Sequence, residues 1–104
     1  MAQFNISDEI KQAVMDELGY GEDSDEERKR RVDRYIQEGM SYLNRVAGTV
    51  VDYASDALAM SLLKTYCRYA NSHALEHFKD NNLADLQSLN FDYNVQEFQA
   101  NGEN

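Results

Sequence analysis

The sequence predicts an all-α protein: a small bundle of about four helices with an extended C-terminal arm. Apolar residues recur at three- and four-residue steps through two long segments, and capping residues and glycines stand at the ends of these segments. We expect two long central helices, a short N-terminal helix and a short C-terminal helix. A chain of 104 residues suffices for one domain, which we place at 1–90, followed by the arm at 91–104.

The first helix is predicted to begin after Ser7, whose hydroxyl can cap the free amides of the first turn. Asp8 and Glu9 follow, and acidic side chains favour the positive end of the helix dipole. Gly19 supplies the left-handed stop. One face of this helix is apolar and consists of Ile10, Val14 and Leu18.

The second helix is predicted to begin at Ser24, because Glu27 three residues later completes a capping-box pattern. Gly48 ends it, which gives a helix of about 22 residues. Gly39 lies inside the helix at a cost of about 1 kcal/mol relative to alanine, so close helix packing is its expected reason. The buried stripe is expected to consist of Val32, Ile36, Met40, Leu43 and Ala47.

The third helix is predicted to be the longest element, from Asp56 to Lys79. The β-branched residues of Thr49–Tyr53 favour an extended connector before it, and Asp52 or Ser55 can provide the N-cap. Apolar and aromatic residues surround most of this helix, which is typical of a helix that is central in a bundle or shared with a neighbour. The single cysteine, Cys67, is expected to be a buried, inert thiol in a reducing compartment.

The C-terminal part is predicted to be a short helix at 83–89 followed by an arm. Apolar and polar residues alternate from Phe91 to Val95, which is the period of a strand, and a lone strand has no sheet to join within a helical domain. We therefore expect the arm to contact a neighbouring subunit or partner, with a frayed end as the alternative. The residues expected to bind the partner are Phe91, Tyr93, Val95 and Phe98.

The net charge of −9 is unevenly distributed. Acids dominate the first 27 residues, whereas the segment 28–34 is basic, and an acidic protein is repelled by nucleic-acid phosphates. Three interpretations of Arg28, Arg30 and Arg31 remain open: a solvated helix face paired with acids at i,i+4, a docking site for an acidic partner protein, or a nucleic-acid contact. No charged-then-apolar leader and no apolar run of about 18 residues occurs, so we expect a protein made and kept soluble.

One short motif resembles a metal site. His73, Glu76 and His77 spell H-x-x-E-H, in which two histidines on one helical face bind zinc and the glutamate acts as a base. A catalytic zinc commonly needs a third protein ligand and a surrounding cleft, and this chain offers little room for either. We expect no catalytic residue, metal or cofactor, and therefore no enzyme.

Two stretches carry a resemblance to a known family. The segment at 55–93 reads SDALAMSLLKTYCRYANSHALEHFKDNNLADLQSLNFDY, and the segment at 31–48 reads RVDRYIQEGMSYLNRVAG. In their aromatic-rich helix, the following turn and the leucine-rich short helix, these stretches resemble the head-tail connector (head-completion, adaptor) proteins of tailed bacteriophages. The resemblance covers about residues 8–95 and is one of pattern and helix order.

The resemblance implies a structural virion protein, made in the host cytoplasm, that forms a ring of about twelve copies. Such a ring lies below the portal protein, binds a downstream neck or tail-completion protein and continues the DNA channel. We expect DNA to pass without specific binding along an acidic lumen lined by Glu22, Asp23, Asp25 and Glu26. The alternative is a small acidic helical adaptor or inhibitor that binds a basic host or phage protein.

Overall fold

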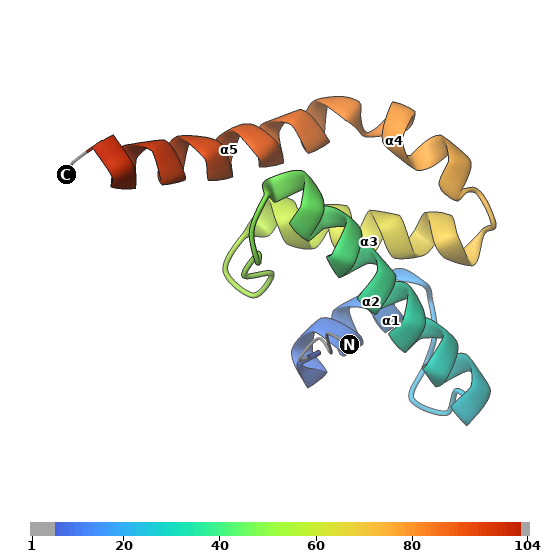
Figure 1. Cartoon of the computed structure of the whole chain (residues 1–104). Coiled ribbons are helices and arrows are strands. Elements are labelled where there is room, and N and C mark those ends of the chain that lie inside the picture. Colours follow the sequence, from blue (N-terminus) through green and yellow to red (C-terminus); the bar gives the residue numbers. More distant parts are fainter. Residues whose placement is uncertain (1–5, 103–104) are drawn as a thin grey trace.

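The computed structural model describes the backbone of residues 6–102 and the side chains of residues 6–95. Within these residues the chain is all-helical and contains no strand, which confirms the predicted fold class (Figure 1). Four helices have ten residues or more, and a single 3-10 turn and one short helix connect the third of them to the last. The elements are α1 (Asp8–Glu17), α2 (Glu26–Ala47), α3 (Ala57–Asn71), η1 (Leu75–His77), α4 (Phe78–Asn81) and α5 (Leu83–Gly102).

The centre of the bundle is the pair α2 and α3, and α1 and α5 lie on opposite sides of it (Figure 1). Helix α3 contacts all three other long helices, which confirms its predicted central position. A Cβ atom at Gly39 would lie 2.8 Å from Leu63 Cδ1 and 2.9 Å from Tyr66 Cδ1, so the glycine allows α2 and α3 to approach closely. The largest fully buried side chains are those of Val14, Val32, Ile36, Leu43, Leu62, Leu63, Cys67, Phe78 and Leu89.

The ends of α1 and α2 follow the predicted capping chemistry, with one correction. Ser7 Oγ accepts a hydrogen bond from Ile10 N at 3.2 Å, and Gly19 and Gly48 have φ angles of 75° and 81°. The prediction of Ser24 as the N-cap of α2 is wrong, because Asp25 Oδ1 accepts from Arg28 N at 2.8 Å and takes that role.

The N-cap of α3 is also displaced from the prediction. Asp56 accepts from Ala59 N at 3.0 Å, so neither Asp52 nor Ser55 is the cap. Asp52 instead accepts hydrogen bonds from Ala54 N and from the hydroxyl of Ser55. These contacts order the connector between α2 and α3, which is non-helical as predicted.

The predicted single helix from Asp56 to Lys79 is interrupted, because α3 ends at Asn71. His73 adopts the left-handed conformation with φ 55°, and Ala74 N donates to Tyr69 O at 2.9 Å while His73 N donates to Ala70 O at 3.1 Å. This pair of bonds is the Schellman motif. The chain then turns back through η1 and α4, and its direction is fixed by Phe78, whose ring contacts the rings of Tyr42, Tyr66 and Tyr69.

The C-terminal predictions were wrong in their secondary structure. Instead of a short helix at 83–89 and a strand-like arm from Phe91, one helix, α5, continues to Gly102. Leu86 and Leu89 are buried against the bundle, and the C-terminal part of α5 extends past the other helices (Figure 1). Among the described residues, no helix is both long and apolar enough to cross a membrane.

Candidate interaction surfaces

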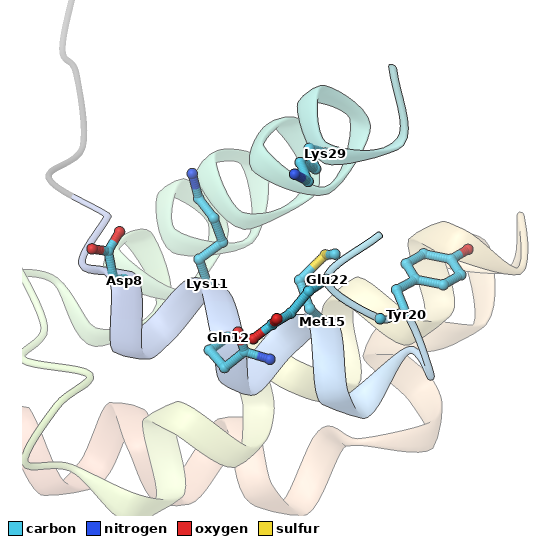
Figure 2. A pocket seen from close by; sticks show the side chains of 8 residues that line it. Asp8, Lys11, Gln12, Met15, Tyr20, Glu22 and Lys29 are labelled. Carbon is cyan, nitrogen blue, oxygen red and sulfur yellow. The ribbon is translucent and has the colours of Figure 1, made fainter. Parts of the chain in front are cut away.

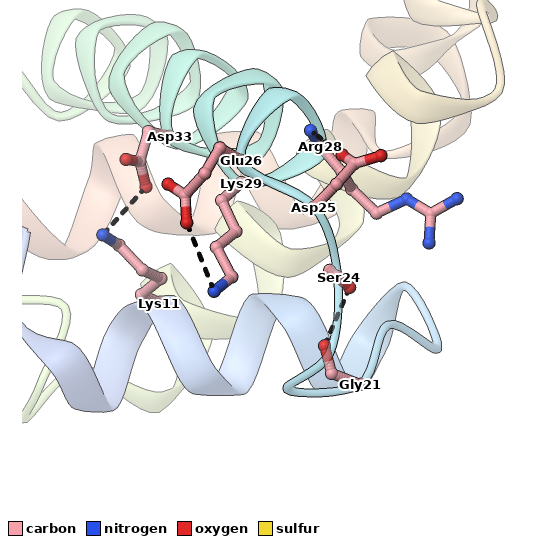
Figure 3. Close-up of polar contacts among 8 residues, drawn as sticks. All are labelled: Lys11, Gly21, Ser24, Asp25, Glu26, Arg28, Lys29 and Asp33. Carbon is pink, nitrogen blue, oxygen red and sulfur yellow. Dashed lines mark hydrogen bonds and ion pairs between the residues drawn. The ribbon is translucent and has the colours of Figure 1, made fainter.

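A groove opens between α1 and the start of α2 (Figure 2). It has a volume of about 360 Å³ and combines two lysines with two acids. Both lysines are engaged, since Lys11 Nζ lies 3.2 Å from Asp33 Oδ1 and Lys29 Nζ lies 3.9 Å from Glu26 Oε1 (Figure 3). The groove therefore presents mixed, internally paired charge. Its lining residues are Asp8, Lys11, Gln12, Met15, Tyr20, Gly21, Glu22 and Lys29.

The four acids predicted to line a channel lie on and beside the loop between α1 and α2, and all four are exposed. They differ in their structural roles. Asp25 caps α2, and Glu26 lies beside Lys29 (Figure 3). Glu22 and Asp23 precede the helix, so their charge can be altered without removing the cap.

The basic cluster does not form the predicted i,i+4 ion pairs. Among the described residues, the one ion pair within the first turns of α2 joins Lys29 to Glu26 at i,i+3. The guanidinium of Arg28 instead stacks on the ring of Tyr20, with Cζ 4.3 Å from the ring centroid. Arg30 is exposed and Arg31 is half-buried, so of the three arginines Arg30 is the most accessible to a partner.

The region around Tyr20 attaches the first loop to the far end of α3. Tyr20 Oη donates to Asn71 Oδ1 at 3.0 Å, and Arg68 Nη1 lies 2.7 Å from Glu17 Oε2. Arg28 on the Tyr20 ring joins the same cluster. Arg28 therefore contributes to the structure of its own chain. A substitution of Arg28 would affect these contacts as well as any contact with a partner.

The H-x-x-E-H motif does not lie on one helical face. His73 follows the end of α3 in a left-handed conformation, whereas Glu76 and His77 belong to η1. All three residues are exposed, and His77 Nε2 lies 3.7 Å from Glu76 Oε1. Within residues 6–95, no group of three His, Cys, Asp or Glu side chains is arranged to hold a metal ion.

Cys67 lies on α3, and its side chain is completely buried in the core of the bundle. Burial, assisted by the charge of Glu38, raises the pKa of its thiol to about 12. A thiol with this pKa is almost entirely protonated at neutral pH, and the thiolate is the nucleophilic form. The sequence prediction of a buried cysteine is confirmed.

The inner face of α5 is tied to the bundle by two side-chain hydrogen bonds. Tyr93 Oη donates to Asp56 Oδ2 at 2.8 Å, and Asn90 Nδ2 donates to Val46 O at 2.8 Å. Burial and the bond to Asp56 raise the pKa of Tyr93 to about 12. Tyr93 was predicted to bind a partner, but its hydroxyl is occupied by the N-cap residue of α3 in its own chain.

The outer strip of α5, defined here as Ala84, Ser88, Phe91 and Val95, lies on the opposite face. These residues are spaced by four, three and four positions, so one side of the helix carries them all. Phe91 is 65% exposed, which is unusual for a phenylalanine. Phe98 follows Phe91 by seven positions within α5, and its side chain lies outside the described residues.

A second large apolar side chain is exposed on the connector between α2 and α3. Val50 is 81% exposed and lines an open groove of about 520 Å³ at the C-terminal end of α2. Sequence reasoning assigned Val50 to the connector without a contact role, because burial cannot be read from an isolated β-branched run. The groove is lined by Ser41, Asn44, Arg45, Gly48, Thr49 and Val50.

Comparison with known proteins gives no assignment: no family model matches the chain, and no curated protein or solved structure is significantly similar to it.

Proposed function

We propose that this chain is a structural connector of tailed bacteriophages, which forms a ring of about twelve copies below the portal and joins the head to the tail. The observation that carries the proposal is the outer strip of α5, because Phe91 is 65% exposed on a helix that extends past its own bundle, where its ring can contact a neighbouring copy or a partner. The all-helical fold agrees with the resemblance of residues 8–95 to connector proteins. The chain acts through contacts and performs no catalysis in this proposal.

The charge of the chain supports a passive DNA channel. A net charge of −9 per copy repels phosphate, so DNA moves past a ring of such copies without adhering to it. Glu22 and Asp23 are exposed on the loop before α2 and are the acids available to face a lumen. Arg30 and Arg31 then serve as the contact with an acidic surface of the portal or of the next neck protein.

The proposal is tested on phage particles from the producing lysate. A tagged chain is captured, and native mass spectrometry measures its stoichiometry with whatever co-purifies. Recovery in multiple copies with a portal protein, and detection of the chain in purified particles, is the expected result. A chain that is absent from particles and from portal complexes contradicts the proposal.

The channel is tested separately with the double variant Glu22→Lys and Asp23→Lys. The matched control is Glu22→Gln with Asp23→Asn, which removes charge without reversing it. We expect genome ejection to be slowest in the lysine variant and intermediate in the control, because positive charge in the lumen attracts phosphate. Asp25 is left unchanged, since its replacement removes the N-cap of α2. Equal ejection rates for wild type and the lysine variant contradict an acidic lumen at these positions.

A second candidate function rests on the same charge. A small acidic helical protein can bind a basic host or phage protein as an adaptor or inhibitor, and an excess of 19 acids over 10 bases favours such a partner. Stoichiometry separates the two functions: an inhibitor pairs one or two copies with its target, whereas a connector forms a closed ring. A one-to-one complex with a basic protein supports the second function.

A further inference from the structure

We infer that copies of this chain join head to tail, with the outer strip of α5 in one copy docked on the groove beside Val50 in the next. This inference rests on the proposed ring, because it names the surfaces through which the ring closes. It starts from one observation: the two most exposed large apolar side chains of the described residues, Val50 and Phe91, lie on two different surfaces.

The outer strip combines apolar contact with negative charge. The exposed Phe91 and the half-buried Val95 supply the apolar part, and the exposed carboxylates of Asp85 and Asp92 lie along its edge, seven residues apart. Helix α5 contains no lysine or arginine from Leu83 to Gly102. A surface that receives this strip therefore needs an apolar floor and a positive side chain.

The groove at the end of α2 meets both requirements. Val50 provides apolar surface, Arg45 is exposed in the last turn of α2, and no acid lines the groove. The groove is open rather than enclosed, so it can receive a helix face laid across it. Phe91 against Val50 and Asp92 against Arg45 give a contact with matched polarity and matched charge.

The strip cannot reach the groove of its own copy without losing the contacts of the inner face. Tyr93 and Asn90 hold that face on Asp56 and Val46, so the strip is directed away from the bundle. The donor and acceptor surfaces consist of different residues, which makes the contact heterologous. A heterologous contact generates a ring when the rotation per copy closes.

The experiment uses two variants of the full chain, Phe91→Gln and Val50→Glu. Both positions are exposed, so circular dichroism is expected to give unchanged helix content and thermal midpoint. Sedimentation velocity of each variant alone is expected to show monomers, with self-association weakened on the order of tenfold or more relative to wild type. An equimolar mixture is expected to form a heterodimer, because the intact strip of the Val50→Glu variant can dock on the intact groove of the Phe91→Gln variant. The heterodimer cannot grow further, since the strip and the groove left at its two ends are the altered ones.

A charge exchange tests the polar half of the contact. Arg45→Glu alone and Asp92→Lys alone are expected to weaken assembly, and the two changes in one chain are expected to restore it, because each then faces the opposite sign. Wild-type assembly by either apolar variant, a mixture that stays monomeric, or a monomeric wild type overturns the inference. The portal experiment is independent: portal-bound chain whose assembly is insensitive to Phe91→Gln overturns this interface and leaves the connector function intact.

Discussion

Replacement of Gly39 by alanine sets two physical effects against each other. Alanine is favoured over glycine inside a helix by about 1 kcal/mol, which alone would stabilise α2. The added Cβ would, however, lie 2.8 Å from Leu63 Cδ1 and 2.9 Å from Tyr66 Cδ1, closer than carbon atoms tolerate. Leu63 is completely buried and Tyr66 nearly so, which limits how far either side chain can move.

Overpacking of a core by a methyl group costs about 1–3 kcal/mol. Set against the gain in helix propensity, the expected result is a net loss of about 1 kcal/mol in the free energy of unfolding. Urea unfolding monitored by circular dichroism measures this loss. The propensity effect is measured in the same helix with Gln37→Ala and Gln37→Gly, because Gln37 is exposed two residues away.

The double variant Gly39→Ala with Leu63→Val provides the test of mechanism. Valine has no Cδ atoms, so the closer of the two contacts disappears, and the combined loss is expected to be smaller than the sum of the single losses. Stabilisation by Gly39→Ala equal to the Gly-to-Ala difference at Gln37 would refute the close-packing argument. Strict additivity in the double variant would show that Leu63 is not the obstacle.

Three further predictions concern single residues. His73→Gly is expected to raise the free energy of unfolding by about 1 kcal/mol, because φ 55° strains any residue with a Cβ. Gly19→Ala is expected to lower the free energy of unfolding by a similar amount, because Gly19 has φ 75°. Equal effects of the two changes in denaturant unfolding would contradict this. Cys67 is expected to resist alkylation at pH 8 in the folded state and to react in urea, and rapid labelling of the native protein would contradict its burial. Stability is expected to fall as the pH rises from about 10 towards 12, because the unfolded state ionises at the ordinary tyrosine pKa of 10.0 while the pKa of Tyr93 is raised to about 12. Tyr93→Phe is expected to make this fall shallower, and an unchanged pH profile of thermal unfolding would count against the Tyr93–Asp56 bond.

Local chemistry accounts for the parts of the fold that the sequence predicted. The hydroxyl of Ser7 and the φ angles of Gly19 and Gly48 are properties of single residues in their immediate surroundings, so the ends of α1 and the end of α2 can be read from the chain. The three- and four-residue periodicity of α2 predicted its length of 22 residues. The displacement of the N-cap from Ser24 to Asp25 is a choice between two adjacent capping residues, which periodicity does not decide.

The end of α3 could not be predicted from the sequence, because the residue in the left-handed conformation is His73 and not a glycine. What holds the turn is the ring of Phe78 against Tyr42, Tyr66 and Tyr69, and these contacts join separate elements. The metal-site motif depended on an unbroken helix, so its geometry was lost at the same point. The physical reason is that packing of an aromatic cluster outweighs local helix periodicity.

The side of α5 that forms the candidate interface also depends on tertiary structure. The alternation of Phe91, Tyr93 and Val95 predicted a strand whose apolar side would hold all three residues together. In α5 a step of two residues turns the side chain to another face, so Tyr93 reaches Asp56, the N-cap residue of α3, while Phe91 is exposed and Val95 is half-buried on the opposite side. The sequence by itself determined the all-helical class, the charge and the aromatic residues of the C-terminal region. The burial of Leu86 and Leu89, together with the bonds from Tyr93 and Asn90 to residues about 40 positions away, determined which side of α5 is left open for a partner.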